Sequence, residues 1–434
     1  MDISTWLPPH TQASIAVIGD VCLDLYYFVN NEGAEVSAET GLQTYSVFGG
    51  KQELGGGGNV AVNCKHLGTH KVDLYGIVGN DPYAHIITSL LDKEGLGKEE
   101  IITQNEHWST HVYHKIYEGV KELPRYDMGN FNKASNESID TLLTLLEQRI
   151  HLYDVIIINE QVPSGMHTPY MQQSLSALIE KTKNSVTWFS DCRKLNDIYG
   201  STIHKLNSDE ASFIAAQHNY KVEAKGEKYY ENLSHYLYTH WKHPVILTLG
   251  ENGAYVCDKG IPVYHEGLHF TKEIDIVGAG DAYLAGLVVA HTQGASIQEA
   301  AMVGTYSAGV ALGKLFETGH PTTEEVLALS TTSDYRYHPF LAKDSRQATL
   351  FKETEIEIIT PLKASKKRHS PKIAIFDHDG TISTLREGWE KVMKEIMLSS
   401  ILGEQLLHAS SDEFEQVEVA IQQMIDKTTG IQTI

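Results

Sequence analysis

Short, almost wholly apolar segments recur along the first 330 residues, and a helical pattern follows most of them. The apolar runs are typical of strands buried on both faces of a sheet, and they lie at residues 15–18, 72–78, 155–158, 186–190, 245–249 and, more weakly, 203–206. The helical patterns lie at residues 60–67, 84–93, 139–149, 170–183, 208–217 and 229–238. This alternation predicts an α/β fold with a doubly wound, mostly parallel sheet.

Two segments, 26–48 and 107–127, break the alternation with polar and aromatic residues that are typical of antiparallel strands. We expect them to form a small β lid over the substrate cleft, where specificity commonly resides. His107, His111 and His114 lie in the second segment. On a strand His114 faces away from the other two, so these histidines do not predict a metal site.

Charge and cysteine content narrow the classes of partner. The 434-residue chain carries a formal net charge of −21, which argues against nucleic acid and against an anionic membrane surface. Its four cysteines, which are scattered without a CxxC spacing, predict neither a metal knuckle nor a disulfide framework. The first residues lack the pattern of a signal peptide, and no apolar run is long enough for a membrane span. We therefore expect a cytoplasmic protein.

A small-residue turn at Gly278-Ala279-Gly280 separates a β-like apolar lead-in from a helical segment at 282–290. Such a turn directs backbone N–H groups and the positive end of the helix dipole toward one point, which suits a phosphate. Asp281, in the first helical turn, would repel a phosphate. Its position is explained if the carboxylate takes a proton from an attacking hydroxyl. The alternative is a carboxylate that only caps the helix.

Four consecutive glycines, residues 55–58, open another helix. Glycine lets the backbone approach a ligand closely, so Gly55 and Gly56 are candidates for substrate contact. Asn59 and Asp24 are short polar residues near strand ends that can bond sugar hydroxyls. The alternative is a flexible tight turn.

Two further patterns follow predicted strands and are candidates for a nucleotide site. Asn207 and Glu210 can hold Mg²⁺ or a metal-bound water near a triphosphate, although a helix N-cap explains the same residues. The segment Thr248-Leu-Gly250-Glu-Asn-Gly253 suits contact with nucleotide phosphates or a plain hairpin turn. No GxxxxGK[ST] pattern occurs, which excludes a P-loop enzyme.

These motifs together resemble the signatures of the PfkB (ribokinase-like) carbohydrate kinases over residues 13–325. The first signature is matched by Gly55-Gly56-x-x-Asn59-Val-Ala-x-Asn63 and Gly76-Ile-Val-Gly79-Asn-Asp81. The second is matched by Asp275-x-x-Gly278-Ala-Gly-Asp281, and the NxxE motif by Asn207-x-x-Glu210.

The resemblance implies a ribokinase-like fold and transfer of phosphate from ATP to a sugar hydroxyl, with Mg²⁺ and, as a further candidate, a monovalent cation. It assigns Asp281 as the general base and Gly278, Ala279 and Gly280 as the anion hole. Asp275, in the same signature, joins the cofactor-binding set.

Within the family, the chain most resembles heptose-phosphate kinase domains, through Gly19-Asp20-x-x-Leu-Asp24, Arg125-Tyr-Asp127 and Gly313-Lys314-Leu315. This likeness makes Lys115 and Arg125 candidates for binding a substrate phosphate, the alternative being surface charge. The chain departs from that group at 160–165, Phe316 and Thr305, and these departures bear on which sugar is used.

The sequence becomes more polar after residue 330. We therefore expect a kinase domain at 13–330 and a linker at 331–371. An apolar run at 373–376 then leads into Asp377-His-Asp379-Gly-Thr, which resembles motif I of the haloacid-dehalogenase phosphatases. The resemblance implies that Asp377 is a nucleophile and Asp379 an acid/base, with Mg²⁺. Only helical patterns follow. Residues 372–434 therefore predict a partial, Rossmann-like haloacid-dehalogenase domain with the start of a helical cap, without phosphatase activity of its own.

The main prediction is a carbohydrate kinase whose partner is a small-molecule sugar or sugar phosphate, heptose 7-phosphate being the best candidate. A different class, a non-catalytic sugar- or nucleotide-binding regulator on a kinase scaffold, has no use for Asp281 as a base. Membership in a bifunctional kinase/phosphatase is a further alternative. The lid segments can also pair with a second subunit, so a homodimer is a candidate assembly.

Overall fold

The computed structural model describes residues 3–119, 121–221, 227–268, 270, 274–315 and 318–331, with short segments at 336–337, 348–350, 357–359, 396–398, 400–402 and 416–421. The chain divides into two compact units, Met1–Thr360 and Pro361–Ile434. Within the described helices, none combines the length and apolar character that crossing a bilayer requires.

The described part of the first unit is built on a nine-stranded sheet in the order β14-β13-β12-β11-β10-β9-β1-β4-β5. The strands β12, β11, β10, β9, β1, β4 and β5 are parallel to one another, and β13 and β14 extend the sheet as antiparallel strands. The bounds are β1 Ser14–Gly19, β4 Lys71–Gly79, β5 Ile101–Gln104, β9 Val155–Glu160, β10 Thr187–Cys192, β11 Ile203–Asn207, β12 Val245–Thr248, β13 Ala254–Asp258 and β14 Ile261–His265. The mostly parallel, doubly wound α/β sheet predicted from the apolar runs is confirmed.

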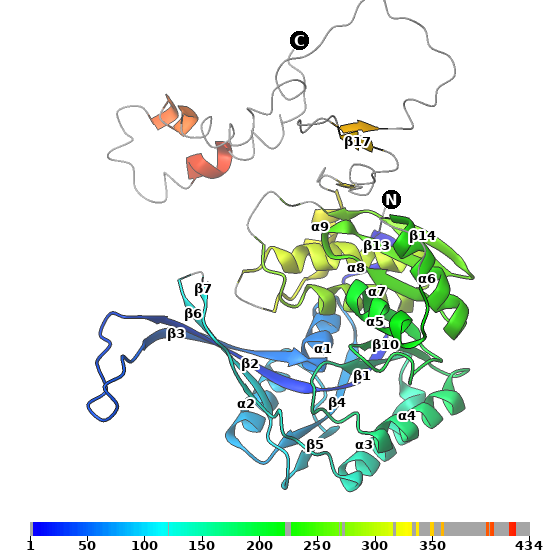
Figure 1. Ribbon diagram of the computed structural model, residues 1–434, viewed down its shortest axis with the longest axis horizontal. Helices are drawn as coiled ribbons and strands as arrows, with labels where there is room; N and C mark the ends of the chain where they lie inside the picture. The colour runs from blue at the N-terminus through cyan, green and yellow to red at the C-terminus, as the bar shows by residue number, and fades with distance from the viewer. Residues whose placement is uncertain are drawn as a thin grey trace, which may run out of the picture. The chain divides into compact units, whose positions relative to one another are not determined.

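Helices cover both faces of this sheet (Figure 1). One face packs against α1 Gly57–His66, α2 Pro82–Glu94, α7 Ala279–Thr292, α8 Ile297–Leu312 and α9 Thr323–Thr331. The other packs against α3 Asn136–Arg149, α4 Pro169–Thr182, α5 Ser208–Gln217 and α6 Glu227–Trp241. Successive strand residues enter opposite cores, as Ile15 and Val17 do on one side and Ala16 and Ile18 on the other.

The remaining described elements of the first unit are short. They are η1 Ser4–Trp6, η2 Ile150–Leu152, η3 Gly250–Asn252, the pair β15 Gly267–Leu268 with β16 Arg336–Tyr337, and the pair β17 Ala348–Leu350 with β18 Glu357–Ile359.

The two segments that were expected to form a β lid contribute strands to a second sheet, which is called the lid below. Its order is β3-β2-β6-β7, with β8 also paired to β6. The bounds are β2 Val21–Asn30, β3 Ser46–Gly56, β6 His111–Glu118, β7 Lys121–Glu122 and β8 Tyr126–Met128. The long β2–β3 hairpin projects from the body of the first unit (Figure 1).

The two strands of the β2–β3 hairpin join the main domain beside one residue, Asp20. It is the single residue between β1 and β2, and its carbonyl oxygen accepts a 2.9 Å bond from the N–H of Gly57, just after β3. Its buried carboxylate accepts bonds from the backbone N–H groups of Gln161, Val162 and Met166. A Cβ at Gly56, where φ is 56°, would collide with the same carbonyl, which explains the glycine.

One local expectation is wrong. The apolar lead-in to Asp281 was expected to be β-like, but residues 274–276 belong to no strand, and 76% of Ile276 is exposed. This stretch has no neighbouring strand to pair with in the described structure. The backbone N–H of Asp275 instead donates to the carbonyl oxygen of Leu312 at the end of α8.

In the second unit, the structure describes helical segments at 396–398, 400–402 and 416–421, where Leu398 and Ile421 are buried together. The proposed motif I residues, Asp377 and Asp379, lie outside the described residues, so the haloacid-dehalogenase expectation stays a prediction.

Candidate active site

The carboxyl ends of the parallel strands gather charged residues at one edge of the main sheet. Glu160 ends β9, Asp191 is the next-to-last residue of β10, and Lys205 lies near the end of β11. Because these strands are parallel neighbours, their ends meet at the same edge, where α/β proteins commonly bind ligands.

The N-terminus of α7 is open for an anion. Gly278 precedes the helix with φ 75°, and a Cβ there would overlap the carbonyl oxygen of Thr318, so only glycine fits. No side chain of the described residues caps this end. The N–H groups of the first helical turn, which includes Ala279 and Gly280, have no partners within the helix, and that of Ala279 donates only a long, 3.4 Å bond to the carbonyl oxygen of Ile276. The arrangement therefore suits an anion at this point.

Asp281 is held beside that N-terminus by an amide from α1. The Nδ2 of Asn59 donates to Oδ2 of Asp281 at 2.7 Å, joining two residues 222 positions apart. Asn63, one turn later, donates to the side-chain oxygen of Asn59 at 3.0 Å and to its carbonyl oxygen at 2.8 Å. These bonds turn the amino group of Asn59 toward the carboxylate. A role in capping the helix does not by itself explain the bond between Asp281 and Asn59.

A buried ion pair adjoins the same helix end, and neither of its members was singled out from the sequence. The Nζ of Lys205 lies 3.0 Å from Oδ2 of Asp191, and both residues are buried. A Cβ on Gly280 would lie 3.3 Å from the same Nζ, which places the ammonium group at the start of α7. The signal available was a charged residue in or directly after each of two predicted strands, Lys205 in 203–206 and Asp191 after 186–190.

Burial and the negative charge of Asp191 raise the pKa of Asp281 from 3.8 to about 6, and the bond from Asn59 and the charge of Lys205 oppose the rise. Such a carboxylate is a stronger base than an ordinary aspartate and is still ionised at neutral pH. Burial, and then Asp191, also raise the pKa of Glu210. The carboxylates at this edge therefore lie close enough to repel one another.

We expect kcat/KM for the acceptor to fall as the pH drops through about 6, because protonated Asp281 cannot accept a proton. A profile measured from pH 5 to 8 should reach its plateau above pH 7. Nucleotide affinity measured over the same range separates this effect from titration of ATP itself. A profile that stays flat down to pH 5 would contradict the assignment.

Asn207 and Glu210 form a capping box at the start of α5. The side chain of Asn207 accepts from the N–H groups of Asp209 and Glu210, and Oε2 of Glu210 accepts from the N–H of Asn207 at 2.8 Å. The helix N-cap, which was the alternative to a ligand site for these two residues, is therefore present. It does not exclude a ligand role, because Glu210 is only half-buried and faces Asp191 and Lys205.

The segment with Thr248, Gly250 and Gly253 forms the connection of an antiparallel hairpin. β12 ends at Thr248, η3 covers Gly250–Asn252, and β13 returns. Gly253 has φ 81°, and a Cβ there would collide with backbone atoms of His265 and Gly267. Beside this backbone lies a cavity of about 520 Å³, lined by Tyr264, His265, Glu266, Leu268, Met302, Thr305 and Tyr306.

Several residues that the sequence suggested for substrate binding lie at the root of the lid. A Cβ on Gly55 would lie 3.0 Å from Oδ1 of Asp24, so this glycine keeps the space beside the carboxylate open. Lys115 does not project into solvent: it is buried, and its Nζ bonds Oδ2 of Asp24 at 2.8 Å and the hydroxyl of Tyr26 at 3.1 Å.

Arg125 directly precedes β8, which pairs with the start of β6 near the root of the lid. Its guanidinium forms a two-point bond to Asp127, at 2.6 and 2.8 Å, and lies over the ring of Tyr113. Both cations singled out for a substrate phosphate are thus already paired with carboxylates. Asp275, assigned to the cofactor, accepts at Oδ1 from the N–H of Val277, and so shapes the turn before α7.

The three-layer α/β fold with its added β sheet is the ribokinase-like fold. The chain belongs to the pfkB family of carbohydrate kinases, whose family model matches residues 12–319.

Its relatives include the "Bifunctional protein HldE" of Aliarcobacter butzleri, which is 26% identical over 88% of this chain and 75% of the relative. Similar solved structures include phosphofructokinase-2 from Escherichia coli in complex with potassium, with a TM-score of 0.58, 16% identity, and coverage of 74% of this chain and 98% of that one. Another is Arabidopsis thaliana ribokinase complexed with ribose and ATP, with a TM-score of 0.56, 16% identity, and coverage of 74% and 100%. At these identities the solved structures show the fold alone.

Proposed function

We propose that the chain transfers the γ-phosphate of ATP to a hydroxyl group of a sugar or sugar phosphate, with heptose 7-phosphate as the leading acceptor. The observation that carries this proposal is the Asp281 carboxylate, held by Asn59 at 2.7 Å beside the uncapped start of α7. The likeness to heptose-phosphate kinase domains, through Gly19-Asp20-x-x-Leu-Asp24 and Arg125-Tyr-Asp127, supports a phosphorylated sugar as acceptor.

In this mechanism Asp281 removes the proton of the acceptor hydroxyl as its oxygen bonds to the γ-phosphorus, and the bond from that phosphorus to the bridging oxygen of ADP breaks. The backbone N–H groups of Gly278, Ala279 and Gly280 and the ammonium group of Lys205 stabilise the charge on the transferred group. Asn59 keeps the carboxylate pointed at the acceptor.

The residues present fit a divalent cation. Mg²⁺ would neutralise part of the triphosphate charge, and Glu210 is the residue that would hold it, directly or through water. Burial and then the charge of Asp191 raise the pKa of Glu210, although the bond from Asn207 and the charges of Lys205 and Arg193 oppose the rise, so a divalent cation would stabilise this carboxylate further. A monovalent cation also belongs to the proposal, because a similar solved structure was determined with potassium.

For the nucleotide, we propose that the base enters the cavity lined by His265, Thr305 and Tyr306, with the phosphates extending past Thr248, Gly250 and Gly253. The cavity offers aromatic and polar walls beside the glycine backbone. The solved ribokinase with ribose and ATP supports ATP as the donor.

We propose that the acceptor lies against Asp24, Gly55, Gly56 and Asn59 under the lid, and that Arg125 binds its phosphate. Arg125→Met should raise KM for a sugar phosphate by about 10-fold or more, since a charged hydrogen bond contributes about 1.5–3 kcal/mol. KM for the same sugar without phosphate should not change. Equal KM increases for both acceptors would show that Arg125 acts on the lid structure instead.

The direct test measures ADP formation from Mg·ATP over a panel of free sugars and sugar phosphates that includes heptose 7-phosphate, with the Asp281→Asn chain as the blank. Turnover of one phosphorylated sugar, absent from the blank, is the expected result. Bound ATP with no turnover of any acceptor would favour a non-catalytic binding protein.

We also propose that residues 372–434 carry the start of a haloacid-dehalogenase domain, on the strength of the pattern Asp377-x-Asp379-Gly-Thr. Mg²⁺ would be held by these two carboxylates. We expect no hydrolysis of p-nitrophenyl phosphate by this chain. Hydrolysis that Asp377→Asn abolishes would show a working phosphatase.

We also propose a homodimer in which the lids of two subunits pair. The molecular mass measured by analytical sedimentation tests this assembly.

A further inference from the structure

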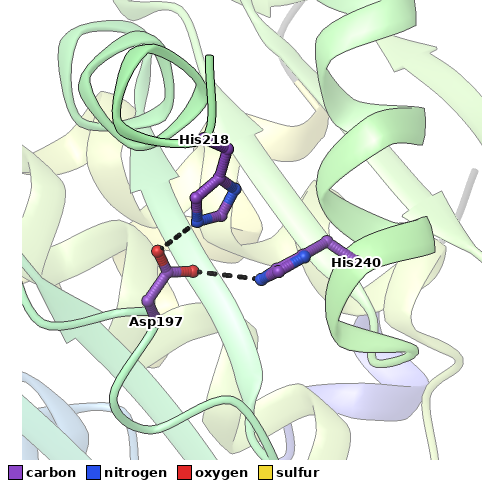
Figure 2. A group of neighbouring side chains, drawn as sticks. All are labelled: Asp197, His218 and His240. Carbon is purple, nitrogen blue, oxygen red and sulfur yellow. Dashed lines mark hydrogen bonds and ion pairs between the residues drawn. The ribbon is translucent and has the colours of Figure 1, made fainter. Parts of the chain in front are cut away.

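Three side chains from separate elements converge away from the active site. Asp197 lies in the loop between β10 and β11, His218 directly follows α5, and His240 lies in the last turn of α6. Figure 2 shows the Asp197 carboxylate pointing toward both imidazoles. One ligand atom from each residue lies within 4.8 Å of the others. The helix α5 separates this group from the candidate active site, because Glu210 lies in its first turn and His218 follows its last residue. A helix of 10 residues is about 15 Å long.

We propose that Asp197, His218 and His240 form a binding site for a divalent first-row transition-metal ion, of which Zn²⁺ fits the ligand set best. Two imidazole nitrogens and one carboxylate oxygen are a common protein ligand set for such ions. The side chain of His240 is 43% exposed, so water can supply a further ligand.

One of the two distances from an imidazole nitrogen to the Asp197 carboxylate matches a metal site and the other is shorter, and each involves a different carboxylate oxygen. Bonds of about 2.0–2.2 Å in a tetrahedral zinc site place neighbouring ligand atoms about 3.2–3.6 Å apart. The Nε2 of His240 and Oδ1 of Asp197 are already 3.5 Å apart. The Nε2 of His218 and Oδ2 of Asp197 are 2.6 Å apart, joined by a hydrogen bond. A metal ion would displace that proton and push the two atoms about 1 Å further apart.

Two outer residues hold the ligands in this orientation. The indole N–H of Trp241 donates to Oδ1 of Asp197 at 2.9 Å. The hydroxyl of Tyr236 lies 2.9 Å from Nδ1 of His218. A hydroxyl can donate or accept, so Tyr236 can pair with either tautomer of His218, including the one that leaves Nε2 free for a metal. Partners of this kind are typical of metal-bound histidines.

The competing interpretation is a plain ion pair between Asp197 and protonated imidazoles. It accounts for His218 but less well for His240, whose ring centroid lies only 4.3 Å from that of His218. Two positive imidazoles at this distance repel each other. A metal ion keeps both rings neutral and still places positive charge beside the carboxylate.

The test uses the full chain without a polyhistidine tag, stripped with a chelator and then titrated with Zn²⁺. The chain has 22 histidines, so weak sites are expected and the measurement must isolate the tight one. We expect one tightly bound zinc per chain, a visible absorption spectrum typical of tetrahedral coordination when Co²⁺ replaces it, and a higher midpoint of thermal unfolding with Zn²⁺ present.

Substitutions identify the site. His240→Gln and Asp197→Asn should each weaken zinc binding by about 100-fold or more, and Tyr236→Phe by about 10-fold, because loss of an outer partner alone commonly costs about 10- to 100-fold. The matched control is His235→Gln, which removes another histidine from α6 and should leave binding unchanged. His240 is the most exposed ligand, so its variant is expected to fold. No tight zinc, or tight zinc retained by His240→Gln and Asp197→Asn, would overturn the proposal.

Discussion

Replacing Asp281 with Asn should lower kcat by about 10²- to 10⁴-fold, the range over which a general base contributes. Asparagine has nearly the same shape and can still bond Asn59, whose amide meets the carboxylate at 2.7 Å. It cannot accept the proton of the acceptor hydroxyl. Affinities for ATP and for the acceptor, measured calorimetrically, should therefore change little.

The control for this first prediction is Asp140→Asn. It removes one negative charge from α3, on the opposite face of the sheet, where the carboxylate accepts only a surface bond from Tyr170 in the described structure. Its kcat should match that of the unchanged chain. An Asp281→Asn chain that keeps its turnover would show that the proton leaves by another route and that Asp281 is not the base.

Replacing Lys205 with Met should damage both turnover and stability. We expect kcat to fall by about 10²- to 10³-fold, the usual effect of removing one group that stabilises transition-state charge. We also expect the free energy of unfolding to fall by about 3–5 kcal/mol, because Asp191 is left as a buried carboxylate without its partner. Both residues are buried and their charged atoms are 3.0 Å apart. Urea unfolding and steady-state kinetics measure the two effects separately.

The double variant Asp191→Asn with Lys205→Met separates the two roles. With no charge left unpaired, most of the lost stability should return, while kcat should stay low. A double variant that regains its turnover along with its stability would make Lys205 a structural residue only. The single variant Asp191→Asn shows how much of the remaining loss belongs to the carboxylate.

The sequence predicted the central strands well because their burial on both faces produces apolar runs that few other structures share. β5, β13 and β14 were missed, and for a physical reason. β14 lies at the edge of the sheet and is largely exposed or half-exposed, as is β5 at the other edge, so their residues are not uniformly apolar. β13 follows a hairpin that the glycines alone do not distinguish from a ligand-binding turn.

The candidate site was predictable where spacing in the chain reflects a turn, as at Gly278–Asp281 and Asn59. Contacts between distant segments were not. Lys205 and Asp191 come together because their strands are parallel neighbours. Lys115 is paired with Asp24 because β2 and β6 are neighbours, with Lys115 opposite Tyr26, two residues from Asp24. Asp197, His218 and His240 have no motif at all, since three separate elements bring them together.

Because the lid is attached at Asp20, a small rotation at this residue would displace the far end of the β2–β3 hairpin by a much larger distance than its root. β2 has 10 residues, which at about 3.3 Å each span about 33 Å, so a 5° rotation at the root moves the tip by about 3 Å. The pivot itself is anchored by three backbone bonds to Asp20, and α1 begins immediately beyond it. The root, where Asp24, Gly55 and Asn59 lie, would move least in such a rotation, so the 2.7 Å bond from Asn59 to Asp281 would be kept while the outer part of the hairpin shifts.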